Sequence, residues 1–256
     1  MSNLIFDTHA HYDDKAFDED RFEIFETLPQ KNIFAVVNAG ADIESSFKSL
    51  ELSDKYDYVY AAVGIHPENL SDMECNYVDM LEKMLKSPKV VAIGEIGLDY
   101  HYSKDRKTEQ LKLFEDQIIL ALKHNLPIIV HDREAHGDTM TLLKKYNPKG
   151  IVHCFSGSVE MAKEVIKLGM YIGIGGLITF KNAKTAVDVV KNVPISSIVL
   201  ETDAPYMTPV PFRGTRCDSS HIKYTAEKIA DIKKMNTDEV LEITKQNAIK
   251  IFNLQV

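Results

Sequence analysis

Six side chains that could bind a metal ion follow short apolar runs spread over most of the chain. They are His9, His11, Glu95, His131, His153 and Asp203. Imidazole and carboxylate groups are common ligands of divalent ions in proteins. Because the carboxyl ends of strands meet at one mouth when a parallel sheet closes into a barrel, this layout predicts a metal centre at such a mouth.

The number of candidate ligands favours two ions. His9 and His11 are two residues apart in an extended run, so their imidazoles should project to the same side. A catalytic zinc ion usually takes three protein ligands and keeps one position open, which is fewer than the chain offers. Six ligands suit two ions about 3.5–4 Å apart, with Glu95 as the candidate bridge. The donor types leave Mg²⁺, Mn²⁺ and Zn²⁺ open.

Apolar, β-branched runs alternate with segments of helical period. We expect strands near 4–8, 33–38, 58–64, 90–94, 127–131, 150–153, 170–174 and 197–202. We expect helices over 14–28, 108–124, after a capping Ser158, and over 237–252 with Thr237 as its cap.

Eight strand–helix units predict an α/β protein with a single (β/α)₈ TIM barrel, formed by one domain over residues 1–256. An open doubly wound sheet is the competing arrangement. It would place ligands in one crevice between neighbouring strands rather than on strands from the first to the last.

Composition limits the partners. The formal charge of −8 argues against a broad basic surface for nucleic acid, so contacts with phosphates must come from a few local groups or from bound cations. Three widely spaced cysteines predict no disulfide framework. No signal peptide and no apolar stretch near the ~20 residues of a membrane span are visible, so we expect a cytoplasmic protein without a membrane association. No obligate protein partner is evident.

Six motifs together resemble the TatD family of metal-dependent deoxyribonucleases. They lie at Phe6–His11, Gly64–Pro67, Gly94–Tyr100, Ile129–Arg133, His153–Gly157 and Leu200–Tyr206. The resemblance runs to Asn247-Ala248 and implies a TIM barrel of the amidohydrolase type, a two-metal centre on the same six ligands, and hydrolysis of DNA, often from a 3′ end. One departure is Cys217–His221, which replaces an Asn-Glu-Pro-like segment in the loop after the last strand.

Further residues have predicted roles around the metals. Asp203 is expected to accept the proton of the attacking water, with Glu95 as its catalytic partner. Glu201, two residues before Asp203, could orient a ligand, although a solvated carboxylate is equally compatible with the sequence.

Three residues are expected to bind the substrate. His66 could contact a phosphate or the leaving oxygen, or be a buried rim histidine. Arg133 and Arg213 could bind phosphate. Pairing of Arg133 with Asp132 or Glu134 is the alternative.

The sequence therefore predicts a metal-dependent hydrolase that cleaves DNA phosphodiester bonds as a 3′–5′ exonuclease, with single strands or 3′ ends as substrate. The alternative is another ester, such as D-aminoacyl-tRNA, or a phosphotriester or lactone, on the same centre. Barrels of the phosphotriesterase type bridge their metals with a carboxylated lysine on strand four, and the segment Gly94–Gly97 contains no lysine. A non-catalytic metal-binding protein is disfavoured because none of the six ligands is missing.

Overall fold

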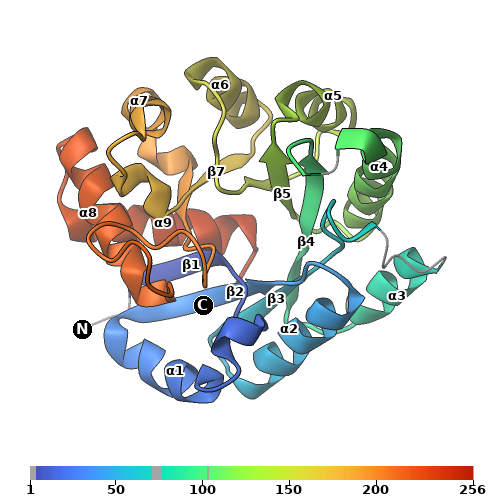
Figure 1. Cartoon of the computed structure of the whole chain (residues 1–256), viewed down its shortest axis with the longest axis horizontal. Coiled ribbons are helices and arrows are strands. Elements are labelled where there is room, and N and C mark those ends of the chain that lie inside the picture. Colours follow the sequence, from blue (N-terminus) through green and yellow to red (C-terminus); the bar gives the residue numbers. More distant parts are fainter. Residues whose placement is uncertain (1–3, 71–75, 103, 256) are drawn as a thin grey trace.

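Eight parallel strands form one sheet in chain order, and helices surround it (Figure 1). The computed structural model describes residues 4–70, 76–102 and 104–255. The strands are β1 (Ile5–Ala10), β2 (Ile33–Ala39), β3 (Val59–Val63), β4 (Val90–Asp99), β5 (Ile128–Arg133), β6 (Gly150–Val152), β7 (Tyr171–Ile174) and β8 (Ile198–Leu200). The predicted eight-stranded TIM barrel is confirmed.

The sheet closes between its first and last strands. Ala10, the last residue of β1, and Ala204, just after β8, form a parallel bridge. The His11 amide donates to the carbonyl of Ala204 at 2.7 Å, and the Asp203 amide donates to the carbonyl of His9 at 3.0 Å. Closure therefore brings the last metal-ligand candidate beside the first two, which an open doubly wound sheet would not do.

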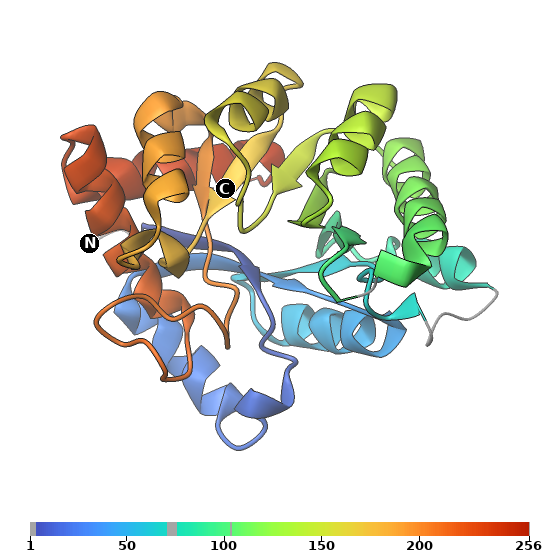
Figure 2. The ribbon, with the colours of Figure 1, turned by 45° about the horizontal axis from the view of Figure 1, so that its top comes forward.

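The principal helices alternate with the strands and cover the outside of the ring (Figure 2). They are α1 (Arg21–Thr27), α2 (Ile43–Lys55), α3 (Tyr77–Met84), α4 (Lys107–Lys123), α5 (His136–Tyr146), α6 (Val159–Lys167), α7 (Lys184–Asn192), α8 (Ile222–Lys233) and α9 (Thr237–Ile251). Short 3₁₀ turns include η1 (Lys15–Phe17) and η4 (Lys104–Arg106). None of the helices in the described part of the chain is long and apolar enough to cross a membrane.

Two helix predictions need correction. The predicted helix over 14–28 is wrong as one element, because Asp14 caps the short turn η1 and α1 begins only at Arg21. The cap of α9 is Asn236, whose side chain accepts the Asp238 amide, and Thr237 is already the first helical residue. Ser158 caps α6 as predicted, accepting the Met161 amide.

Strand β4 continues past Glu95 to Asp99, so the prediction that it ends near residue 94 is wrong. Gly97 has a φ of +150°, and a Cβ atom built there would lie 1.9 Å from the backbone oxygen of His131. Only glycine allows this close approach, which keeps β4 paired with β5 up to Asp99 and Arg133. The extension carries Asp99 to the mouth of the barrel.

An apolar layer lies beneath the mouth. Ile129 and Ile151 precede His131 and His153 by two residues, so each shares a face of its strand with the histidine above it. They belong to a buried cluster that also contains Phe252, just after α9, whose ring stacks on Phe6. The rigid packing below fixes the strand ends that position the polar groups.

Candidate metal centre

The six predicted metal ligands lie together at the carboxyl end of the barrel. The Nε2 atoms of His9 on β1 and His11 just after it are 3.0 Å apart, as expected for side chains two residues apart in an extended segment. Asp203 follows β8 with a φ of +61°, a left-handed conformation that aspartate tolerates better than most residues. Its Oδ1 lies 3.5 Å from His11 Nε2 and 3.7 Å from His9 Nε2.

The two carboxylate oxygens of Glu95 face different halves of this cluster. Oε2 lies 3.3 Å from His9 Nε2 and 3.4 Å from His11 Nε2. Oε1 lies 2.8 Å from His131 Nδ1 and 2.8 Å from His153 Nε2. Glu95 therefore stands between two sets of donors, which is the position of a bridging carboxylate.

The donor spacing fits divalent ions. Three triplets have ligand atoms that all lie within 4.8 Å of one another: His9, Glu95 and His153; His9, His11 and Asp203; and His66, Glu95 and His131. Two atoms that bind the same ion at about 2.1 Å can be at most about 4.2 Å apart, and the contacts given above are all shorter than this. The Nδ1 atoms of His9 and His153, which do not make these contacts, are buried and have no hydrogen-bond partner among the described residues. The residues fit a metal centre.

The electrostatics of the cluster favour bound positive charge. Burial acts to raise the pKa of Glu95, but the surrounding imidazoles, His153 foremost, hold it well below its usual range. Burial acts to lower the pKa of His131, but hydrogen bonds with Asp99 and Glu95 raise it to about 10. Carboxylates that stabilise a proton on an imidazole would also stabilise a divalent cation.

His66 lies within the same cluster. Its Nε2 is 3.5 Å from Glu95 Oε1, and burial lowers its pKa to about 3, so the ring is neutral near pH 7. The sequence predicts contact with a phosphate or with the leaving oxygen, with a buried rim histidine as the alternative, and the ring is indeed buried. The structure places His66 in a donor triplet as well, which makes it a seventh candidate ligand.

Asp99 is a site residue that the sequence reasoning missed. Its Oδ2 lies 3.1 Å from His131 Nε2, and its Oδ1 accepts the backbone amides of His101 and Tyr102. The side-chain amide of Gln110 on α4 accepts a hydrogen bond from the backbone amide of Asp99 and donates one to its carbonyl. Gly97-Leu98-Asp99 is part of one of the family motifs, but the apolar run that precedes it does not predict that the strand extends to Asp99.

Glu201 is buried, with 1% of its surface exposed, which excludes the solvated alternative. Its Oε1 accepts the backbone amide of Cys154 and lies 3.8 Å from Nδ1 of His153. Burial raises the pKa of Glu201 to about 8. The carboxyl group therefore lies near Nδ1 of His153, without a hydrogen bond between the two side chains.

Arg133 and Arg213 lie at the rim rather than in the donor cluster, and both are exposed. The Arg133 guanidinium lies 4.6 Å from the centre of the Tyr102 ring, and that of Arg213 lies 4.0 Å from the Phe180 ring. The alternative pairing of Arg133 with Asp132 or Glu134 is wrong. Those acids instead contact His136 and His101, respectively.

The segment Cys217–His221, where the sequence departs from the family pattern, is joined to β1 by hydrogen bonds. Asp218 caps the short turn η7 (Ser219–His221). The Ser219 hydroxyl donates to Asp7 Oδ2 at 2.7 Å, and Thr202 donates to the same carboxylate through its amide and its hydroxyl. The buried Asp7 thus ties the loop after β8 to β1, two residues before His9.

Comparisons with known proteins agree with this geometry. The family described as TatD related DNase matches residues 6–253. YabD of Bacillus subtilis, described as an uncharacterized metal-dependent hydrolase, is 42% identical over 98% of this chain and 100% of its own length. YjjV of Escherichia coli K12, which carries the same description, is 32% identical over 97% of both chains.

The solved structure of the TatD homologue YjjV from E. coli K12 superposes with a TM-score of 0.94, at 30% identity and with full coverage of both chains. The sequence match and the superposition both extend over the barrel and its mouth. The chain belongs to the TatD family and is a metal-dependent hydrolase.

Proposed function

We propose that the protein is a divalent-metal-dependent deoxyribonuclease that hydrolyses phosphodiester bonds from the 3′ end of DNA on a two-metal centre. The observation that carries the proposal is the division of the donors by Glu95, whose two oxygens face His9 and His11 on one side and His131 and His153 on the other. The family match supports DNA as the substrate. A cytoplasmic location stays a prediction from the sequence.

Two divalent ions held by these residues would lower the pKa of a water molecule and stabilise negative charge on a phosphate. His9, His11 and Asp203 would hold one ion, His131 and His153 the other, and Glu95 would bridge them. Whether Mg²⁺, Mn²⁺ or Zn²⁺ is used follows from affinity and availability rather than from donor type alone.

Asp203 is the best-placed proton acceptor. Burial acts to raise its pKa, but the hydrogen bond with His11 and the nearby imidazoles lower it overall, so the carboxylate is ionised at neutral pH. About a fifth of its side chain remains exposed, in contrast to 5% for Glu95. Asp203 can therefore receive a proton from a water that reaches the mouth, while Glu95 stays enclosed by imidazoles.

The rim residues would hold the substrate. The fork-shaped guanidinium groups of Arg133 and Arg213 can each make two hydrogen bonds to a phosphate. His66 would steady the departing 3′ oxygen or complete the second metal site. Glu201 would orient His153 through its buried carboxyl group.

The test is a time course on 5′-labelled single-stranded and duplex DNA with protein freed of metal by EDTA and then supplied with Mg²⁺, Mn²⁺ or Zn²⁺. The expected result is a ladder that shortens from the 3′ end only when metal is present. Asp203→Asn should lose the activity, and Asp188→Asn, at an exposed position of α7, should retain it. Deacylation of D-aminoacyl-tRNA without cleavage of DNA under any of these conditions would overturn the proposal.

A further inference from the structure

Exposed aromatic and aliphatic side chains gather at the mouth of the barrel. Of the eight large hydrophobic residues that the described chain exposes, four come from the loops after β4 and β8: Tyr102, Tyr206, Val210 and Phe212. Tyr102 is 62% exposed and Tyr206 is 54% exposed. Clustered exposure of apolar surface marks a binding site more often than single exposed residues do.

Tyr102 is linked to the metal centre through Asp99. Its backbone amide donates to Asp99 Oδ1 at 2.8 Å, and the other oxygen of Asp99 contacts His131. Arg133 lies against the ring at 4.6 Å, and within the described residues this guanidinium forms no ion pair. The pair thus combines an aromatic surface with an unneutralised cation beside His131.

Tyr206 is held at both ends despite its exposure. Its backbone amide donates to the carbonyl of Asp203 at 2.8 Å, and its hydroxyl donates to Asp14 Oδ2 at 2.9 Å. The loop that carries it is also fastened to the β1 side by the ion pair between Arg216 and Asp20. Figure 2 shows the loop after β8 (orange) beside the segment between β1 and α1 (blue). No aromatic ring or cation packs on the ring of Tyr206 in the parts of the chain that the structure describes.

The two tyrosines stand on opposite sides of the mouth. β4 and β8 are four strands apart in a ring of eight, so loops that leave their carboxyl ends face each other across the opening. A line of contacts joins them: Asp99 meets His131, Glu95 lies between His131 and His11, and His11 contacts Asp203. The metal centre therefore lies between the two rings.

We propose that Tyr102 and Tyr206 are base-binding residues, each stacking on one base of a polynucleotide whose intervening phosphate lies at the metal centre. This inference rests on the proposed deoxyribonuclease function. An aromatic ring stacks on the face of any base, which binds a strand without selecting its sequence. A base within a duplex is already covered on both faces, so these platforms favour unpaired ends. The net charge of −8 is compatible with this mode of binding, because stacking on bases reduces the need for a long basic groove.

Binding of fluorescein-labelled oligothymidylate, followed by anisotropy with Mn²⁺ in the Asp203→Asn background, tests the inference without hydrolysis. Tyr102→Ala and Tyr206→Ala should each weaken affinity by about tenfold. Tyr102→Phe and Tyr206→Phe keep the ring and should bind nearly as tightly as the parent protein. In the active protein, the two alanine variants should raise KM much more than they lower kcat.

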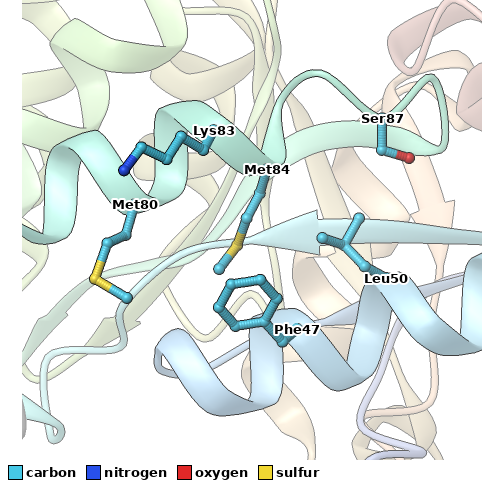
Figure 3. A pocket seen from close by; sticks show the side chains of 6 residues that line it. All are labelled: Phe47, Leu50, Met80, Lys83, Met84 and Ser87. Carbon is cyan, nitrogen blue, oxygen red and sulfur yellow. The ribbon is translucent and has the colours of Figure 1, made fainter.

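Phe47→Ala is the matched control. Phe47 is 49% exposed, close to the value for Tyr206, but it lies on α2. There it faces Met80 and Met84 of α3 across an apolar hollow of about 360 Å³, which Leu50, Lys83 and Ser87 complete (Figure 3). This variant should bind oligothymidylate like the parent protein.

An oligonucleotide with abasic positions near its 3′ end completes the test. If the tyrosines stack on bases, removing the base and removing the ring should cost the same affinity, and the two changes together should cost no more than either alone. Additive losses, or alanine variants that bind normally, would overturn the stacking roles. If the metal-loaded parent protein neither binds nor cleaves DNA, the proposed function itself fails, which is a different result.

Discussion

Oδ2 of Asp99 lies 3.1 Å from Nε2 of His131, while Nδ1 of the same imidazole lies 2.8 Å from Oε1 of Glu95. The two nitrogens of His131 thus have different partners: Nε2 contacts the buried carboxylate of Asp99, and Nδ1 faces the donor cluster. A carboxylate in this position fixes the tautomer and orientation of a metal-binding histidine and increases its basicity. Asp99 itself is 1% exposed, and the hydrogen bonds of its Oδ1 leave it little freedom to turn away.

Asp99→Asn should therefore weaken metal binding by about 10- to 100-fold, because the amide keeps the shape of the side chain but removes its charge. Titration of EDTA-treated protein with Mn²⁺, followed calorimetrically, measures the affinity. Asp105→Asn, at an exposed position of η4, is the control and should bind Mn²⁺ normally. Equal affinities for the Asp99→Asn protein and the wild type would show that Asp99 does not position the ligand.

The barrel could be predicted from the sequence because its evidence is local. Short β-branched runs alternate with helical periods, and a ligand-type residue follows most of the runs that end at the mouth. Counting eight units predicted closure, and closure implied that Asp203 would meet His9. These inferences needed no knowledge of side-chain packing.

The rest of the site depends on contacts between distant segments. Asp99 was not predicted because the apolar run of this strand ends near residue 94, and only the close approach of Gly97 to His131 allows β4 to continue to Asp99. The hydrogen bond from Tyr206 to Asp14 spans 192 positions, and that from Ser219 to Asp7 spans 212. No periodicity in the sequence encodes which loops meet above a closed barrel.

The buried Glu201 should make the stability of the metal-free protein depend on pH. Burial raises its pKa to about 8, from an ordinary value of 4.5 in an unfolded chain. Between these pH values the folded protein keeps a proton that the unfolded chain releases, so the contribution of Glu201 to stability is present at low pH and is lost as pH rises toward 8.

Glu201→Gln should remove this dependence. In EDTA, the free energy of unfolding of the wild type should fall more steeply between pH 4.5 and 8 than that of the variant, by up to about 1.4 kcal/mol per pH unit. Urea unfolding across this range measures the slope. Glu227→Gln, at an exposed position of α8, should behave like the wild type, and parallel curves for Glu201→Gln and wild type would contradict the assignment.

Bound metal should stabilise the fold. A substitution that removes a ligand from both halves of the donor cluster should reduce this stabilisation more than one that removes a ligand from a single half. A ligand at 100 times its Kd adds about 2.7 kcal/mol to the free energy of unfolding. Glu95 contacts both halves of the cluster, whereas among the described residues the Asp203 side chain contacts one half, His9 and His11. Thermal unfolding with and without Mn²⁺ should show the largest stabilisation for the wild type, less for Asp203→Asn and least for Glu95→Gln. A Glu95→Gln protein stabilised as much as the wild type would exclude a bridging role.

Salt should weaken the binding of single-stranded DNA only moderately, because few cations are free at the mouth. Arg133 and Arg213 lie on aromatic rings and form no ion pair within the described residues. Two or three phosphate contacts on a single strand give a slope of log K against log salt of about −1.4 to −2.1.

Replacing one of these arginines should lower the magnitude of the slope by about 0.7, the value for one phosphate contact on a single strand. Arg133→Gln and Arg213→Gln should both show this change in titrations of oligothymidylate at increasing KCl. Arg106→Gln is the matched control, since that guanidinium already donates to both oxygens of Glu109, at 2.7 and 3.0 Å, and releases no counterion on binding DNA. A slope far steeper than −2.1 in the wild type would mean that DNA follows an extended basic path away from the mouth, and an unchanged slope in both variants would remove the arginines from the phosphate contacts.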